Sequence, residues 1–144
     1  MKAANALDDI GRRIEAFAAD NFHAPLRDCA AVISIAVEEN FNRSSTPEGS
    51  AWPPRKIIGD GHPLLVDTGD LFFAAVEHNA SGHVENYGEK ELQYGVDGSV
   101  IEYAATHNYG RENIPQREFL GLGEPYLAEC ENALAEYALK TYLK

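Results

Sequence analysis

The residues of this sequence that could do chemistry are concentrated around one short segment, residues 62–71. His62, Asp67 and Asp70 lie within it and His78 follows, and imidazole nitrogens with carboxylate oxygens are common metal ligands. Their spacing is not that of a paired-ligand motif such as His-x-x-x-His. Asp67 can instead cap a helix, and Asp70 can lie in the first turn, where the helix dipole favours a carboxylate. We therefore expect a structural corner here, and no bound metal.

His107 is the residue that looks most like part of an active site. An enzyme would have to combine it with His62, Asp67 and Arg117, which are far apart in the sequence. A histidine near the end of a helix more often complements the helix dipole. The sequence has no Gly-x-Ser-x-Gly elbow, no cysteine in a nucleophile context and no phosphate-binding glycine loop. We predict no catalytic residue and no cofactor.

Two cysteines, Cys29 and Cys130, each fall on the apolar face of an expected helix. In a reducing compartment such residues are small core side chains, with a disulfide bond between them as the alternative. The N-terminus turns acidic before a signal-peptide core could form, so we expect the protein to stay in the cytosol where it is made.

The net charge of −11 is unevenly distributed along the 144 residues. Residues 60–136 hold fifteen acidic and three basic residues, which gives this part a net charge of −12. An acidic surface repels phosphate and disfavours sequence-specific binding of nucleic acid. No apolar run approaches the roughly 20 residues of a membrane helix, so no membrane partner is expected.

Two amphipathic helices open the chain. Leu7, Ile10, Ile14 and Phe17 recur at intervals of three and four, and a second such stripe runs from Leu26 to Phe41 after a break before Pro25. The pair could pack as an antiparallel hairpin or extend away from the body to meet a neighbouring subunit. The pattern does not choose between these arrangements.

A long loop, residues 42–60, separates the helices from the rest of the chain. It exceeds an ordinary connection in length, so it is functional or mobile. Trp52 followed by Pro53 is a rigid anchor, which either closes over the chain's own core or inserts into an adjacent subunit. Arg55 and its neighbour form a basic pair too small for a phosphate groove.

The remaining elements predict an α+β fold. We expect a buried strand at residues 64–66, a helix capped by Asp67 or Thr68, a hairpin of strands 83–87 and 91–96, and a helix over 100–110. Residues 111–122 should form an extended arm, and a last helix from residue 124 should pack on the small, mainly antiparallel sheet. The predicted single domain, residues 1–144, thus comprises a helical pair (1–41), the loop (42–60) and an α+β core (61–144).

Four motifs occur in a characteristic order between residues 41 and 125. They are Glu48-Gly49-x-x-Trp52-x-Pro54, then His62-Pro63-Leu64-Leu65 with Asp67-Thr68-Gly69-x-Leu71, then Tyr103-Ala104-x-x-His107-Asn108-x-Gly110, and finally Ile114-Pro115-x-Arg117-x-Phe119-Leu120-Gly121. Together they resemble the bacteriophage virion morphogenesis family, which includes the Mu-type tail completion proteins. Two positions depart from the family pattern: Asn108 stands where Gln is common, and Glu118 where Pro is common.

The resemblance implies a non-enzymatic structural protein that completes the tail or closes the head–tail joint. It would act as a homo-oligomeric ring, with a hexamer favoured over a dodecamer, on the tail tube and head–tail connector, with DNA passing through its lumen. It would be found in the host cytoplasm during assembly and then in the virion. The expected interface residues are Trp52, Pro53, Arg55, Arg117, Phe119 and Leu120. An assembly chaperone absent from the mature virion, or a His/Asp metal enzyme, are the alternatives.

Overall fold

The computed structural model describes residues 3–56 and 61–142, and its class is α+β, as predicted. Parts of the loop at 57–60 and both chain ends lie outside the described residues. Along the chain the elements are α1 (Ala3–Ala19), α2 (His23–Arg43), α3 (Asp70–Val76), β1 (His83–Tyr87), β2 (Leu92–Val96), α4 (Ala104–Tyr109) and α5 (Glu124–Tyr142). No helix in the described ranges is both long enough and apolar enough to cross a bilayer.

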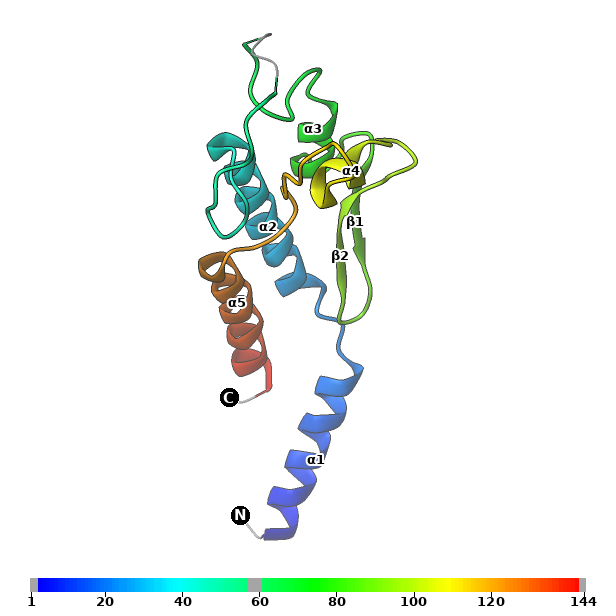
Figure 1. Cartoon of the computed structure of the whole chain (residues 1–144). Coiled ribbons are helices and arrows are strands. Elements are labelled where there is room, and N and C mark those ends of the chain that lie inside the picture. The colour runs from blue at the N-terminus through cyan, green and yellow to red at the C-terminus, as the bar shows by residue number, and fades with distance from the viewer. Residues whose placement is uncertain (1–2, 57–60, 143–144) are drawn as a thin grey trace.

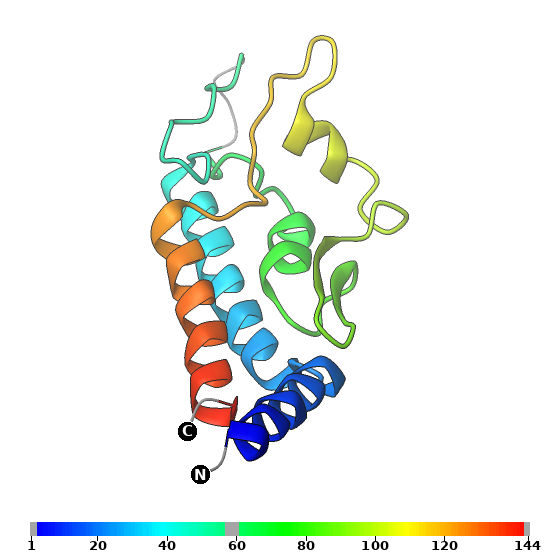
Figure 2. The ribbon, with the colours of Figure 1, turned by 90° about the horizontal axis from the view of Figure 1, so that it is seen from below.

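Helix α2 is the central element of the fold. It lies between α5 on one side and α3 with the β hairpin on the other (Figure 1 and Figure 2). Pro25 sits in its first turn, where a missing N–H costs no hydrogen bond. The C-terminal helix α5 packs mainly along α2, and α2 in turn contacts both strands. The layer between α5 and the sheet is therefore α2 itself.

Helix α1 does not pack back along α2 as a hairpin. It projects from the body (Figure 1) and meets the end of α5, where the Phe17 ring lies 5.4 Å from the Tyr142 ring and Arg13 donates to the Tyr142 carbonyl at 3.1 Å. Its apolar stripe is left facing solvent, with Leu7 70% and Ile14 63% exposed. Of the two arrangements open to the helical pair, the structure has the extended one.

The predicted hairpin is confirmed within one residue, with β1 and β2 paired antiparallel so that Glu85 opposes Tyr94. The predicted strand at residues 64–66 was wrong. These residues form a turn in which Leu65 has φ +62 and the Val66 N–H donates to the Pro63 carbonyl at 3.2 Å. A three-residue apolar run can be buried without pairing, and here its side chains pack against the core from a turn.

The hydrophobic core joins segments that are distant in sequence. Phe41 of α2 is its centre, with ring centroids of Trp52, Phe72 and Phe119 at 5.7, 5.3 and 5.4 Å. Aromatic pairs at such distances add to the stabilisation from their buried area. Around them lie the other buried core residues, Val37, Leu71, Ala74, Ala75, Ile101 and Ala104.

The helix expected over 100–110 is shorter than predicted. Asp97 accepts hydrogen bonds from the Ser99 backbone N–H at 2.8 Å and from the Ser99 hydroxyl at 2.7 Å, and these bonds hold the residues before α4 in turns. Gly110 ends it, with φ +76.

Cys29 and Cys130 are buried free thiols, and burial raises the pKa of Cys130 to about 12.

Candidate functional site

The motif residues from four separate segments surround one cavity of about 450 Å³. The long loop contributes Arg55, the corner before α3 contributes residues 62 and 64–71, α4 and the turn before it contribute Tyr103 and His107, and the arm contributes Arg117. Segments up to 62 residues apart in the chain therefore build a common site. The sequence motifs identify these residues, but only the folded chain brings them together.

Arg55 fastens the long loop to the corner. Its Nη2 donates to the backbone carbonyls of His62 at 2.6 Å and Pro63 at 2.9 Å. Bonds from a guanidinium are stronger than bonds between neutral groups, so they can hold two irregular segments together. His62 Nε2 also lies 3.8 Å from Asp67 Oδ1 across the corner. His62 and Asp67 thus help to stabilise the conformation of the corner.

Arg117 fastens the arm to the same loop. The side chain is buried, with Nε donating to the Pro53 carbonyl at 2.8 Å and Nη2 to the Pro54 carbonyl at 3.0 Å. Burial, together with the nearby positive charge of Arg55, lowers the pKa of Arg117. These contacts give Arg117 a bracing role between the arm and the loop.

His107 lies in the wall of the cavity beside Arg117. Its carbonyl accepts the Arg117 backbone N–H at 2.8 Å, while its Nδ1 is buried without a hydrogen-bond partner in the described part of the chain. Burial first, and the Arg117 charge second, lower the pKa of His107. A neutral imidazole results, and no described serine, cysteine or carboxylate is bonded to its Nδ1.

The start of α3 differs from the predicted cap. Gly69, with φ +90, occupies the N-cap position and makes no side-chain bond, whereas either Asp67 or Thr68 was expected there. Thr68 Oγ1 accepts the Asp70 N–H at 3.3 Å from outside the helix, and Asp70 lies in the first turn as predicted. Glycine is needed because a side chain rarely adopts this backbone conformation.

The two aromatic anchors expected at a subunit joint are occupied within the chain. Trp52 is buried, and its Nε1 donates to the Glu118 carbonyl at 2.9 Å, while Phe119 is fully buried in the core. The Asn108 carboxamide accepts the backbone N–H groups of Phe119 and Leu120, both at 3.1 Å. The arm is thus bonded to its own core, and Trp52 takes the intramolecular alternative that the sequence left open.

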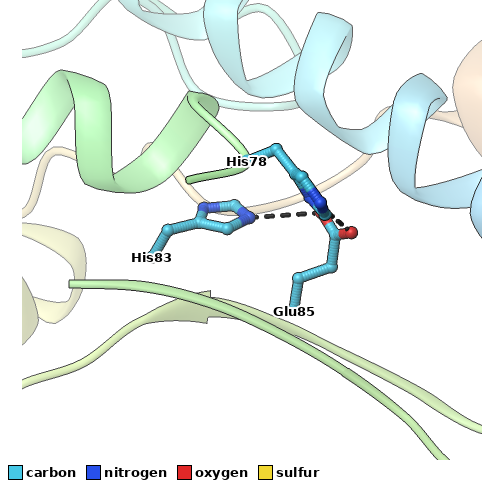
Figure 3. A group of neighbouring side chains, drawn as sticks. All are labelled: His78, His83 and Glu85. Atoms are coloured by element: carbon cyan, nitrogen blue, oxygen red, sulfur yellow. Dashed lines mark hydrogen bonds and ion pairs between the residues drawn. The ribbon is translucent and has the colours of Figure 1, made fainter. Parts of the chain in front are cut away.

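A second polar cluster, formed by His78, His83 and Glu85, lies at the junction of α3 and β1 (Figure 3). His78 Nδ1 is 2.8 Å and His83 Nε2 is 3.2 Å from the Glu85 carboxylate. His78 therefore does not join His62, Asp67 and Asp70 in a metal site. Within residues 3–56 and 61–142, this is the one group of three potential ligands close enough to hold a metal ion.

The sequence contained a signal for this cluster. His83 and Glu85 are two residues apart in a strand, so their side chains point to the same face, and His78 is five residues upstream across a turn. The alternation of residues 83–87 by itself predicts only a strand. That pattern alone does not predict which face of the strand is buried.

Comparison with known proteins gives one match. A profile described as the phage virion morphogenesis family matches residues 2–138, nearly the whole chain. No curated protein and no solved structure matches at the level required for significance.

Proposed function

This chain belongs to the phage virion morphogenesis family, and on that premise we propose that it is a structural protein that completes the tail or closes the head–tail joint. It acts without catalysis, as a closed ring of identical subunits, six being favoured over twelve. A tail tube has cyclic symmetry, and each subunit of such a ring meets two neighbours through different surfaces. The protein works in the host cytoplasm during assembly and is retained in the virion.

The observation that carries the ring proposal is the unpartnered apolar face of α1. Leu7, Ile10 and Ile14 are each more than half exposed along a helix that leaves the body. Ile10 and Ile14 also line an apolar groove of about 450 Å³ between α1 and the end of α5. An exposed apolar surface of this kind is typical of a contact with another subunit, and in a ring it would meet a different surface of the neighbour.

The charge of the chain supports the same arrangement. Residues 60–136 carry a net charge of −12, and an acidic lumen lets DNA pass without adhering to the wall. Subunits of net charge −11 also repel one another in solution. Because added salt screens that repulsion, with a Debye length of about 10 Å at 0.1 M, association should strengthen with ionic strength or on docking to a partner.

The test is the mass of the untagged protein, alone and with purified tail tubes, measured by light scattering across ionic strength. Ile14→Asp should abolish the ring and the completion of infectious particles, because it places a charge in the apolar contact. Arg12→Gln is the matched control, since it makes the same change in net charge on the opposite face of α1. A monomer under every condition, or an Ile14→Asp protein that assembles as the parent does, would refute the ring.

Detection of the protein in purified virions separates a structural component from an assembly chaperone. We expect a fixed number of copies per particle, in a multiple of six. A protein that is needed for infectious particles but absent from them would be a chaperone instead.

A further inference from the structure

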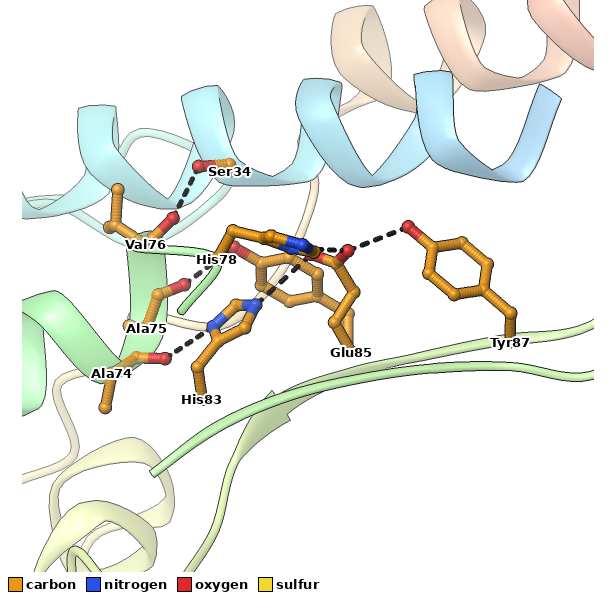
Figure 4. A network of polar contacts seen from close by, with 9 residues as sticks. Ser34, Ala74, Ala75, Val76, His78, His83, Glu85 and Tyr87 are labelled. Atoms are coloured by element: carbon orange, nitrogen blue, oxygen red, sulfur yellow. Dashed lines mark hydrogen bonds and ion pairs between the residues drawn. The ribbon is translucent and has the colours of Figure 1, made fainter. Parts of the chain in front are cut away.

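Side chains from three elements fasten the last turn of α3 (Figure 4). Ser34 of α2 donates to the Val76 carbonyl at 2.8 Å, Tyr94 of β2 donates to the Ala75 carbonyl at 2.8 Å, and His83 Nδ1 bonds the Ala74 carbonyl at 2.7 Å. The end of a helix leaves such carbonyls without partners, and here each has one. The His83 ring is thereby fixed in position and orientation.

The bond to Ala74 determines which nitrogen of His83 carries a proton. A carbonyl oxygen only accepts, so Nδ1 must donate, and in the neutral ring Nε2 then has a free lone pair. That lone pair points at Glu85 Oε1, 3.2 Å away, and an ionised carboxylate is also only an acceptor. Two acceptors can face each other at this distance only with a proton or a metal cation between them.

We propose that His78, His83 and Glu85 form a binding site for a divalent zinc-type cation. Two histidines and one glutamate are a common donor set for zinc sites that keep a fourth position open. Zinc–ligand distances of about 2.0–2.2 Å in a tetrahedron place neighbouring ligand atoms about 3.3 Å apart. Nε2 of His83 and Oε1 of Glu85 are 3.2 Å apart, and one ligand atom from each of the three residues lies within 4.8 Å of the others.

The surroundings are those of a metal site with supporting hydrogen bonds. Metal-bound histidines usually donate their other ring nitrogen to a carbonyl or carboxylate, as His83 does to Ala74. The Tyr87 hydroxyl donates to Glu85 Oε2 at 2.8 Å and orients the carboxylate. Both ligating residues of β1 are thus held in place before any ion arrives.

Access to the site comes from the His78 side. The His83 side chain is 2% exposed, whereas that of His78 is 69% exposed and can close over an ion from solvent. A cavity of about 560 Å³ adjoins His78 and Glu85, with Arg27, Ser34, Val76 and Tyr87 in its wall. It has room for a water molecule as the fourth ligand.

The local charges also suit a cation. The Glu85 carboxylate brings a negative charge to the site, and the Tyr87 hydroxyl donates to it. Arg27 in the cavity wall is a positive charge that opposes the binding of a cation. The chain as a whole, with a net charge of −11, favours it.

A bound ion would link the chain that leaves α3 to strand β1 through His78. This proposal does not rest on the tail-completion role, and it departs from the sequence-based expectation of no metal. That expectation was argued for His62, Asp67 and Asp70 together with His78, and did not consider His83 or Glu85 as ligands.

The test uses the untagged full-length protein, stripped with a chelator and titrated with Zn²⁺ by calorimetry and equilibrium dialysis. We expect one ion per chain and a raised melting temperature. His78→Gln and Glu85→Gln should each weaken binding at least about tenfold, the lower limit for loss of even a supporting group. His23→Gln is the matched control, since His23 bonds the Gly88 carbonyl of the same hairpin outside the cluster and its loss should leave affinity unchanged.

A further readout identifies the ligands. Cobalt in place of zinc should give a tetrahedral spectrum without a thiolate charge-transfer band, which excludes Cys29 and Cys130. No stoichiometric binding, a thiolate band, or a His78→Gln protein that binds as tightly as the parent would overturn the proposal.

Discussion

Asn108 is the residue whose replacement tests most directly how the arm is held. It is 5% exposed, and its Oδ1 accepts both the Phe119 and Leu120 backbone N–H groups at 3.1 Å. Asn108→Leu keeps the side-chain volume close to the original but removes the oxygen that accepts both hydrogen bonds. A buried donor left without a partner costs about 1–3 kcal/mol. Since Leu120 is only half-buried, water can hydrogen-bond its N–H group in part of the molecules. We therefore expect the free energy of unfolding to fall by about 2–4 kcal/mol in total.

Urea unfolding, followed by circular dichroism and by Trp52 fluorescence, measures this loss. In a chain of this size it corresponds to a fall in melting temperature of about 10 °C. Gln116→Leu is the control, because Gln116 is exposed and donates only to the Asn108 carbonyl at 3.1 Å. A loss below about 0.5 kcal/mol, the usual range for a surface substitution, would refute the idea that Asn108 anchors the arm.

Two other substitutions test the corner before α3 and the cavity wall. Gly69→Val should lower the free energy of unfolding by about 2 kcal/mol, because Gly69 has φ +90 and a Cβ there would lie 2.9 Å from the Phe73 ring. Gly49→Ala is the control, since Gly49 has φ +94 but open space around it and should show only the backbone cost of about 1 kcal/mol. Equal urea midpoints for the two proteins would show that the Phe73 contact is irrelevant. Burial lowers the pKa of His107 in the folded state, so the unfolded chain binds its proton more readily and stability should decline as pH falls below about 6.5. That decline, measured as the urea midpoint between pH 8 and pH 5, should be smaller in His107→Gln, and an identical pH profile would contradict it.

The sequence by itself was enough for the parts of the fold that depend on short-range patterns. Apolar residues at helical spacing predicted α1, α2 and α5, and the alternation around residues 83–96 predicted the hairpin. Gly110 and Pro25 were placed correctly, because the backbone limits of glycine and proline act within one or two residues. The motifs also singled out residues that line the cavity of Arg55, His107 and Arg117, since a motif depends only on the order of residues along the chain.

Tertiary structure alone decided what each of those residues does. Trp52 could have met a neighbouring subunit, but it bonds the Glu118 carbonyl 66 residues away, and Arg117 reaches back to Pro53 over a similar separation. His78 likewise joins His83 and Glu85 only because the end of α3 is packed against β1. A side chain's partner depends on which distant segments share the core, and that is fixed by the packing of the whole chain rather than by its local pattern.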